Sequence, residues 1–216
     1  MLHAVRLVGE FFARLEKLDE AIAAAVAACR CQHCQGPLHR SDYQRKPRGA
    51  LLAPTGEAFT IRHSLCCGRR GCRKRATPPS LRFLGRRVYL EVVVIMASMV
   101  AQTMVMTARA AIAVTGVSLR TLRRWGDWWR GTFPKLPVWL ELRARFVPPP
   151  PDESDLPRSL VARLAGDGAR HDTAADGSVN EEALLLASRH LAPATTISVV
   201  KGSRFVTAAF ASMAVS

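Results

Sequence analysis

The sequence is poor in acidic residues, has only two tyrosines, and has no cysteine after residue 72. Its 17 Asp and Glu residues face 31 Lys and Arg residues, which gives a formal net charge of +14. Few of the acids fall in apolar segments typical of strands, where a two-metal nuclease would carry its carboxylates. The sequence also lacks a phosphate-binding glycine loop and a nucleophile elbow. These absences favour a protein without an active site of its own, with an enzyme as the open alternative.

A long apolar run is also missing. The longest uncharged stretch of high hydropathy, residues 92–108, has 17 residues, at the short edge of the roughly 17–25 residues that a membrane span requires. It therefore predicts a buried helix, and a membrane-anchored scaffold is the alternative. Near the N-terminus, Glu10, Arg14 and Glu16 interrupt any apolar segment of a signal peptide. We therefore expect a cytoplasmic protein that is not inserted in a membrane.

The positive charge is concentrated in two blocks. Residues 30–87 contain 14 Lys and Arg residues against two acids, and residues 109–145 contain eight against two. A concentrated positive field attracts polyanions and releases their counterions on contact. The two blocks therefore predict a nucleic-acid-binding protein. The alternative is that the charge serves solubility only.

All six cysteines lie within 44 residues. In a cytosolic chain, such clustering indicates a metal site more than disulfides. Cys31 and Cys34 form a CxxC pair, and Cys67 and Cys72 form a second pair with four residues between them. We predict that these four are the ligands of one zinc ion. Four thiolates complete a tetrahedral shell and leave no open position, so the zinc would be structural.

The ligand set leaves some alternatives open. Cys66 is the alternate for Cys67, and His33 or Cys29 competes on the side of the first pair. A redox-active CxxC is less favoured because the second pair would then have no role and no βαβ pattern surrounds the first. Glycines beside the pairs are expected to permit tight turns: Gly36, Gly68 and Gly71.

A helix-turn-helix pattern follows the apolar stretch. Residues 108–114 predict a short helix, residues 115–118 a turn, and residues 119–130 a second helix with Ser118 as its N-cap. The spacing of the second helix predicts an inward face of Leu119, Leu122, Trp125 and Trp129. Another side carries Arg120, Thr121, Arg124 and Trp128. An apolar back with long donors in front is typical of a helix that reads the major groove. A plain amphipathic helix is the alternative.

Other patterns complete the secondary structure. Apolar residues every three or four positions predict a helix over residues 3–28, packed on its own domain or, alternatively, forming a dimer seam. Short strands are expected at Ala58–Leu65 and Leu81–Tyr89. Pro148–Pro151 predicts a stiff linker followed by solvated acids, and residues 181–191 predict a short helix.

Together these patterns predict a mainly α protein with a small β zinc-ribbon, in the order N-terminal helix, zinc ribbon, buried helix, helix-turn-helix and α-helical C-terminal region. The predicted division is an N-terminal amphipathic helix at 1–29, a zinc-ribbon domain at 30–90, a helical domain with the helix-turn-helix at 91–147, and a Pro-rich linker with a C-terminal region of unassigned role at 148–216.

The cysteine region resembles the zinc ribbons at the front of bacterial insertion-sequence transposases and their companion proteins. The resemblance rests on Cys31-Gln32-His33-Cys34-Gln35-Gly36 and on Cys72-Arg73-Lys74-Arg75-Ala76-Thr77-Pro78. In such proteins a basic stretch, a Thr-Pro turn and a hydrophobic helix follow the last cysteine. The string Gly-Val-Ser-Leu-Arg-Thr-Leu-Arg-Arg-Trp is similar to the turn and recognition helix of bacterial regulators and transposases. One departure is Ile112, where a small residue is usual.

The patterns and the resemblance lead to one functional expectation. The chain would be a zinc-binding, sequence-specific DNA-binding protein of a mobile element, without a catalytic domain and associated with the nucleoid. The resemblance implies double-stranded DNA, a transposase or a second copy of the chain as partners. The alternatives are a zinc-ribbon RNA-binding protein and a transcriptional regulator. The predicted DNA contacts are Arg69, Arg70, Arg73, Lys74, Arg75, Ser118, Arg120, Thr121, Arg123 and Arg124.

Overall fold

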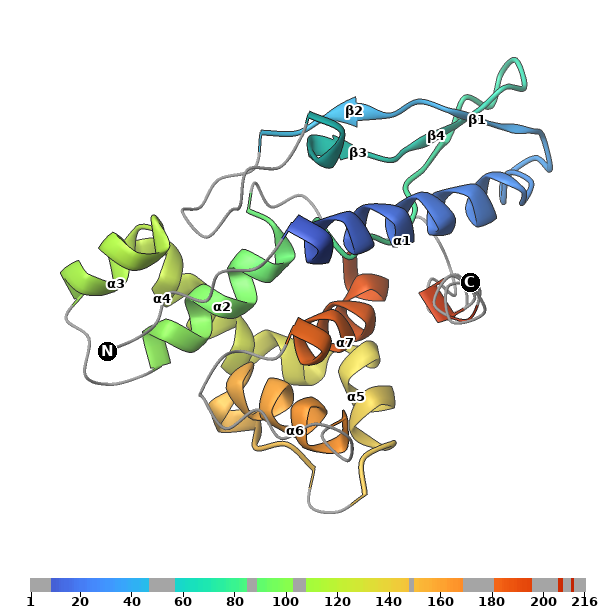
Figure 1. Cartoon of the computed structure of the whole chain (residues 1–216). Coiled ribbons are helices and arrows are strands. Elements are labelled where there is room, and N and C mark those ends of the chain that lie inside the picture. The colour runs from blue at the N-terminus through green and yellow to red at the C-terminus, as the bar shows by residue number, and fades with distance from the viewer. Residues whose placement is uncertain are drawn as a thin grey trace. The chain divides into compact units, whose positions relative to one another are not determined.

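The computed structural model describes residues 9–46, 57–84, 89–102, 108–147, 150–168, 181–195, 206–207 and 211. Figure 1 labels helices α1–α7 and strands β1–β4. Contacts divide the chain into two compact units. One contains Tyr89–His190 and is called here the helical unit. The other contains Gly9–Pro47, Pro54–Val88 and Leu191–Ser216, and is called the cysteine unit because it holds all six cysteines. Mostly helical elements and small antiparallel sheets make up the described chain.

The cysteine unit combines one long helix with very short strands. Its elements are α1 (Gly9–Ala27), β1 (Leu38–Arg40), β2 (Tyr43–Gln44), the 3₁₀ helix η1 (Glu57–Thr60), β3 (Ile61–Arg62), β4 (Leu65–Cys67), β5 (Arg75–Ala76) and the 3₁₀ helix η5 (Ala192–Thr195). One antiparallel sheet has the order β1-β4-β5, and β2 pairs with β3 in a second. Strands of two or three residues provide few ladder hydrogen bonds, so other interactions must stabilise this unit.

Helix α1 buries the apolar face that its sequence predicts. Leu15, Leu18 and Ile22 are at most 2% exposed, and the ring of Phe12 meets that of Phe59 edge to face at 5.3 Å. The face is thus covered within the chain, as expected for a helix packed on its own domain. The helix is observed from Gly9, and the earlier part of the predicted segment lies outside the described residues.

A buried carboxylate on α1 binds the segment that follows β5. Asp19 is 1% exposed. One of its oxygens accepts hydrogen bonds from Arg82 Nε at 2.8 Å and Ser80 Oγ at 2.5 Å, and the other accepts from the backbone N–H of Leu81 at 2.7 Å. Hydrogen-bond donors of the protein therefore replace the water that the buried carboxylate loses, as a buried charge requires.

The guanidinium of Arg82 extends this network to η1 and β3. Arg82 donates to the backbone carbonyls of Ala58, Phe59 and Ile61 at 3.3, 2.8 and 3.0 Å. It also lies over the rings of Phe59 and Phe83, at 5.3 and 5.4 Å from the ring centroids. One side chain thus connects α1 to two segments that have little regular structure of their own.

The same network explains why the two predicted strands were wrong in part. Ala58–Thr60 belongs to η1, and only Ile61–Arg62 and Leu65–Cys67 form strands. Residues 81–84 form bends with a single bridge residue at Phe83. Ser80 Oγ accepts from the backbone N–H groups of Arg82 and Phe83, at 3.1 Å in both cases. Side chains thus occupy the backbone groups that a strand would have used.

The helical unit is built around one largely apolar helix, α2. Its elements are α2 (Glu91–Gln102), α3 (Ala108–Thr115), α4 (Leu119–Asp127), the π-helical turn η2 (Trp128–Thr132), the 3₁₀ helix η3 (Phe133–Lys135), α5 (Pro137–Arg143), the 3₁₀ helix η4 (Glu153–Asp155), α6 (Arg158–Gly168) and α7 (Glu181–Leu191), whose last residue belongs to the other unit. All residues of α2 from Glu91 to Ser98 are buried, which confirms the predicted buried helix. Within the described residues, no helix combines the length and apolar character that a bilayer crossing requires.

Aromatic side chains fill the space beside α2. Trp125, Trp129 and Trp139 are at most 1% exposed. The indole N–H of Trp129 donates to Ser98 Oγ of α2 at 3.1 Å, and its ring packs on Phe133 at 4.9 Å between centroids. These contacts fix α4 and η2 against α2. The sequence predicted the inward position of Trp125 and Trp129, and the structure confirms it.

The acids after the proline run have partners that the sequence does not predict, although Asp152 stays exposed as expected of a solvated charge. Glu153 accepts from the indole N–H of Trp139 and from Arg143, at 2.9 Å in both cases. Asp155 forms an ion pair with Arg158 at 2.8 Å. The carboxylate of Asp152 caps η4. These acids satisfy donors of neighbouring helices, information that composition alone does not contain.

The buried ion pair yields a stability prediction. We expect Asp19→Ala to lower the free energy of unfolding by about 3–5 kcal/mol, because it leaves the guanidinium of Arg82 buried without its counter-charge. Glu20→Ala, next to it on α1, removes a carboxylate that is 56% exposed and paired with Arg40; it should cost at most about 1 kcal/mol. Urea denaturation followed by circular dichroism measures both. Equal costs for the two variants would contradict a dominant role for Asp19.

Candidate metal centre

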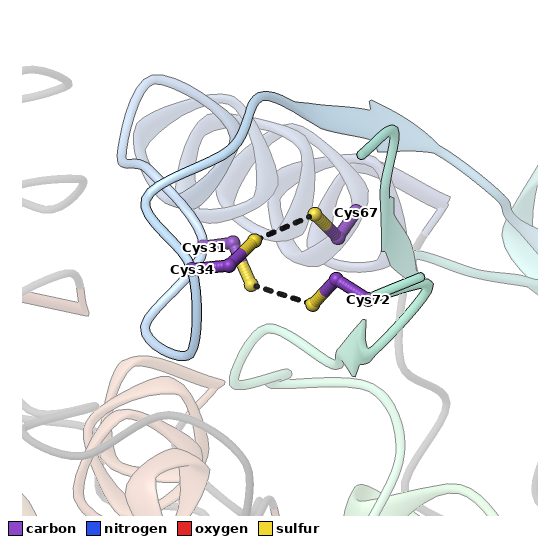
Figure 2. A group of neighbouring side chains, drawn as sticks. All are labelled: Cys31, Cys34, Cys67 and Cys72. Atoms are coloured by element: carbon purple, nitrogen blue, oxygen red, sulfur yellow. Dashed lines mark hydrogen bonds between the residues drawn. The ribbon is translucent and has the colours of Figure 1, made fainter. Parts of the chain in front are cut away.

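Four cysteine side chains converge on one point in the cysteine unit. The sulfur atoms of Cys31, Cys34, Cys67 and Cys72 all lie within 4.8 Å of one another, and Figure 2 shows them turned toward one another. The closest separations are 3.4 Å between Cys34 and Cys67, and 3.8 Å between Cys31 and Cys72. Thiolates about 2.3 Å from a tetrahedral ion lie about 3.8 Å apart. The four cysteines that the spacing singled out can therefore hold one metal ion.

The first pair lies in a tight loop directly after α1. The backbone N–H of Gln35 donates to the carbonyl of Cys31 at 2.8 Å, and the N–H of Cys31 donates to the carbonyl of Gly36 at 2.9 Å. Gln35 has a left-handed backbone with φ of 57°. This turn directs the N–H of Gly36 at the sulfur of Cys34. The loop thus places two sulfurs and one N–H···S hydrogen bond at the site.

The second pair closes a wider loop between β4 and β5. The N–H of Cys67 donates to the carbonyl of Lys74 at 3.0 Å, and that of Cys72 donates to the carbonyl of Arg69 at 3.2 Å. Arg73, directly after Cys72, is left-handed with φ of 46°. The N–H of Lys74 then bonds to the sulfur of Cys72, as that of Arg69 bonds to the sulfur of Cys67. Both loops therefore end alike: a left-handed residue, then an N–H donated to the preceding cysteine.

The three glycines act in ways that the sequence did not distinguish. Only Gly71 has positive φ, at 83°, as a turn glycine would. At Gly36 a Cβ atom would lie 3.0 Å from the sulfur of Cys67, and at Gly68 it would lie 2.4 Å from a ring nitrogen of His39. The missing side chain at Gly36 thus makes room for the sulfurs themselves, whereas the contact at Gly68 is with the exposed side chain of His39, which can move aside.

The competing ligands lie outside the cluster. Cys66 and Cys67 are neighbours on β4, where successive side chains point to opposite faces. The thiol of Cys66 donates instead to the carbonyl of Arg73 at 3.5 Å. The thiol of Cys29 donates to the carbonyl of Ala25 at the end of α1. His33 is exposed and is not part of the group that converges.

The cluster has an uneven acidity. The backbone N–H of Gly36, with help from the neighbouring thiols and against the effect of burial, lowers the pKa of Cys34 from 9.0 to about 7. At Cys67 the N–H of Arg69 acts in the same direction, but burial and the other three sulfurs raise the pKa to about 12. The pKa of Cys72 is also raised: the N–H of Lys74 lowers it, and Cys34 and burial outweigh that effect. A divalent cation at the centre would stabilise all four thiolates.

Cationic side chains surround the cluster and fall into two groups. Arg69 donates to the carbonyl of Cys34 at 3.1 Å, Arg30 donates to that of Gln35 at 3.3 Å, and Arg75 donates to Ser64 Oγ at 3.4 Å. Arg69 and Arg30 thus brace the first loop, and Arg75 binds the residue before β4. All of these cations are exposed, but those of the second group have, within the described residues, no hydrogen bond or ion pair: Arg70, Arg73 and Lys74.

The second basic block contains two helices joined by a three-residue turn. Gly116 lies in this turn with φ of 63°, and its N–H donates to the carbonyl of Ile112 at 2.8 Å. Val117 is fully buried. The hydroxyl of Ser118 accepts from the N–H of Thr121 at 3.4 Å, so Ser118 is the N-cap of α4 as predicted. Ile112, which the pattern placed at the packed position of α3, is instead 40% exposed.

Helix α4 has a buried face and a cationic face. Leu122 and Trp125 are buried. Leu119, which the spacing assigned to the same face, and Thr121, which was expected outside, are both half-buried. Trp128 is half-buried as well, since it packs on Trp129 and Phe133. The exposed set on this helix includes Arg120, Arg123 and Arg124. The arginines are thus available to a ligand, whereas Trp128, which the spacing placed on the same side, packs on its aromatic neighbours.

The chain was compared with protein families, with curated proteins and with solved structures. No family model, curated protein or solved structure matches it.

The geometry of the cluster predicts its stoichiometry. The purified chain is expected to bind one zinc ion, and Cys34→Ser should abolish stoichiometric binding because three thiolates no longer complete the shell. Cys66→Ser is the matched control, since its thiol points away from the cluster, and this variant should retain one ion per chain. Elemental analysis of gel-filtered protein gives the ratio. Loss of the ion from Cys66→Ser would contradict the ligand set.

The uneven acidity predicts how metal binding depends on pH. Cys67 and Cys72 have raised pKa values, so at neutral pH a metal must displace their protons. Zinc affinity should therefore rise with pH and fall steeply below about pH 7, where Cys34 is also protonated. Competition with a chromophoric chelator at several pH values measures this. Calorimetry in buffers of different ionisation enthalpy counts the protons released, and a pH-independent affinity would contradict thiol ligation.

Proposed function

We propose that this chain is a zinc-binding protein that binds double-stranded DNA in a sequence-specific manner. The observation that carries the proposal is the exposed face of α4, where Arg120, Arg123 and Arg124 lie opposite the buried Leu122 and Trp125. Arginines three and four positions apart share one side of a helix. From there their donors can form bidentate hydrogen bonds to guanine in the major groove.

The start of α4 supports this orientation. In helix-turn-helix proteins, the first residues of the second helix contact the base edges. Ser118 and Thr121 hydroxyls lie 3.0 Å apart at this end, next to Arg120. Helix α4 carries no acid before Asp127, at its last residue. The first turns of the helix therefore combine hydroxyl and guanidinium donors without a carboxylate that would repel phosphate.

The cysteine unit supplies a second cationic surface of a different kind. Its loop from Cys67 to Arg75 contains five Lys and Arg residues and no acid. Contacts of this kind bind phosphates and carry no sequence information. We propose that zinc is the ion and that it holds this loop in shape, because four sulfurs at these separations suit a closed, structural zinc site. The loop from Cys67 to Arg75 would then bind the phosphate backbone of the DNA, and α4 would contact the bases.

The biological setting is proposed from the resemblance alone. Insertion-sequence transposases and their companion proteins carry similar cysteine and turn motifs, which suggests a mobile-element factor that acts on DNA in the nucleoid with a transposase or a second copy of the chain. The alternative, an RNA-binding zinc ribbon, requires exposed aromatics for base stacking. The two cysteine loops contain none. Elsewhere in the same unit Phe59 and Phe83 are buried, and Tyr43 on β2 is 40% exposed, so a single tyrosine away from the loops is a weaker basis for base stacking than the arginine face of α4 is for groove contacts.

The reading role of α4 can be tested with one arginine. Duplexes selected by binding to the purified chain define its site. On that site, Arg124→Ala should weaken binding by about 1–3 kcal/mol and relax specificity at one base pair. Arg158→Ala is the control, because Arg158 lies on α6 and is paired with Asp155; it should leave affinity unchanged. Fluorescence anisotropy with the selected and a scrambled duplex measures both. An equal loss of affinity on both duplexes would reject base reading by Arg124.

A further inference from the structure

The two cysteine loops place different residues in the same strained backbone position. Gln35 follows Cys34 with φ of 57°, and Arg73 follows Cys72 with φ of 46°. In each loop this left-handed residue turns the next N–H toward the cysteine sulfur. The requirement falls on the backbone alone. Glycine meets it without strain, whereas a residue with a Cβ adopts this conformation at a cost.

Nothing inside the described chain explains why an arginine occupies position 73. Its side chain is exposed and, within the described residues, has no hydrogen bond or ion pair. Arg69 and Arg75, by contrast, donate to Cys34 and Ser64. The N–H···S hydrogen bond accounts for the left-handed backbone at this position, and glycine would supply that backbone with less strain. The side chain of Arg73 therefore needs a reason of its own, which points to a role toward a ligand.

The surroundings of Arg73 define what that ligand is. Arg70 and Lys74 are also exposed and without an internal partner in the described chain, and no acid occurs between residues 67 and 84. Three like charges on one loop repel one another until an anion binds. The loop contains no aromatic residue to stack on a base. A phosphate of the nucleic-acid backbone is the chemistry that fits.

We propose that Arg73 is the principal phosphate contact of the cysteine unit, and that Arg69 and Arg75 are positioning residues that do not touch DNA. This proposal rests on the proposed DNA binding. It narrows the set of contacts, because the sequence pattern predicts DNA contacts from all five cations of the loop. Arg73 follows Cys72 directly, so an ion held by Cys72 fixes the backbone from which this side chain extends.

A matched pair of variants tests the proposal. Arg73→Gly and Gln35→Gly relieve the same backbone strain at equivalent positions, but only the first removes a charge. Both should keep one zinc ion per chain and melt at a temperature no lower than the parent. For a mixed-sequence duplex near 0.1 M salt, Arg73→Gly should lower affinity roughly five- to tenfold and reduce the slope of log K against log salt by about 1. Gln35→Gly should bind as the parent does.

Two further variants keep the outcome unambiguous. Arg73→Gln places at position 73 the residue that the first loop has at position 35, so a residue with a Cβ still occupies the left-handed backbone. It should show the same reduction in the slope of log K against log salt, even if Arg73→Gly folds poorly. Arg69→Ala should lower the melting temperature and leave the salt slope at its parent value once the protein is folded and metal-bound. If the parent binds duplex and both Arg73 variants keep the parent's salt slope, this inference is overturned and the proposed function stands. A parent without affinity for duplex overturns the proposed function as well.

Discussion

The convergence of four cysteine sulfurs is the constraint on which the cysteine unit depends. Strands of two or three residues cannot organise a loop as basic as the one between Cys67 and Arg75. The N–H···S hydrogen bonds at Cys34, Cys67 and Cys72 turn both loops toward a single centre. A cation held there would offset the mutual repulsion of the thiolates and would couple the folding of the loops to metal binding.

A buried ion pair is a second constraint on the cysteine unit, in a part of it that lies outside the cysteine cluster. The Asp19–Arg82 pair is almost completely buried, and its hydrogen bonds reach α1, η1, β3 and the segment after β5. Such a pair adds little net stability over a well-packed apolar core. Its value here is directional: each donor and acceptor specifies where one irregular segment lies. The two cysteine loops and this network therefore fix the irregular segments of the cysteine unit in place, as long strands do in larger sheets.

The helical unit is stabilised mainly by apolar packing. Helix α2 is buried from Glu91 to Ser98, and Trp125 and Trp129 anchor α4 and η2 to it. Because the back of α4 is fixed by large rigid rings, its arginine face is presented on a firm support, which specific recognition requires. The chain thus carries two cationic surfaces, one on the loops that hold the cysteine cluster and one on a helix backed by an aromatic core. The proposed function assigns phosphate contacts to the first surface and base contacts to the second.

The sequence by itself determined the features that depend on local spacing: the two cysteine pairs, the buried apolar helix, the Ser118 cap and the inward positions of Trp125 and Trp129. Each follows from residues close in the chain, whose relative directions are set by helix or loop geometry. Only the tertiary structure decided that Cys67 and not Cys66 joins the first pair, that residues 81–84 do not form a regular strand, and that Gly36 makes room for the sulfurs. Those outcomes depend on strand pairing and on groups such as Asp19 and the sulfur of Cys67, which are distant in sequence from the residues they contact and act through contacts that no local pattern encodes.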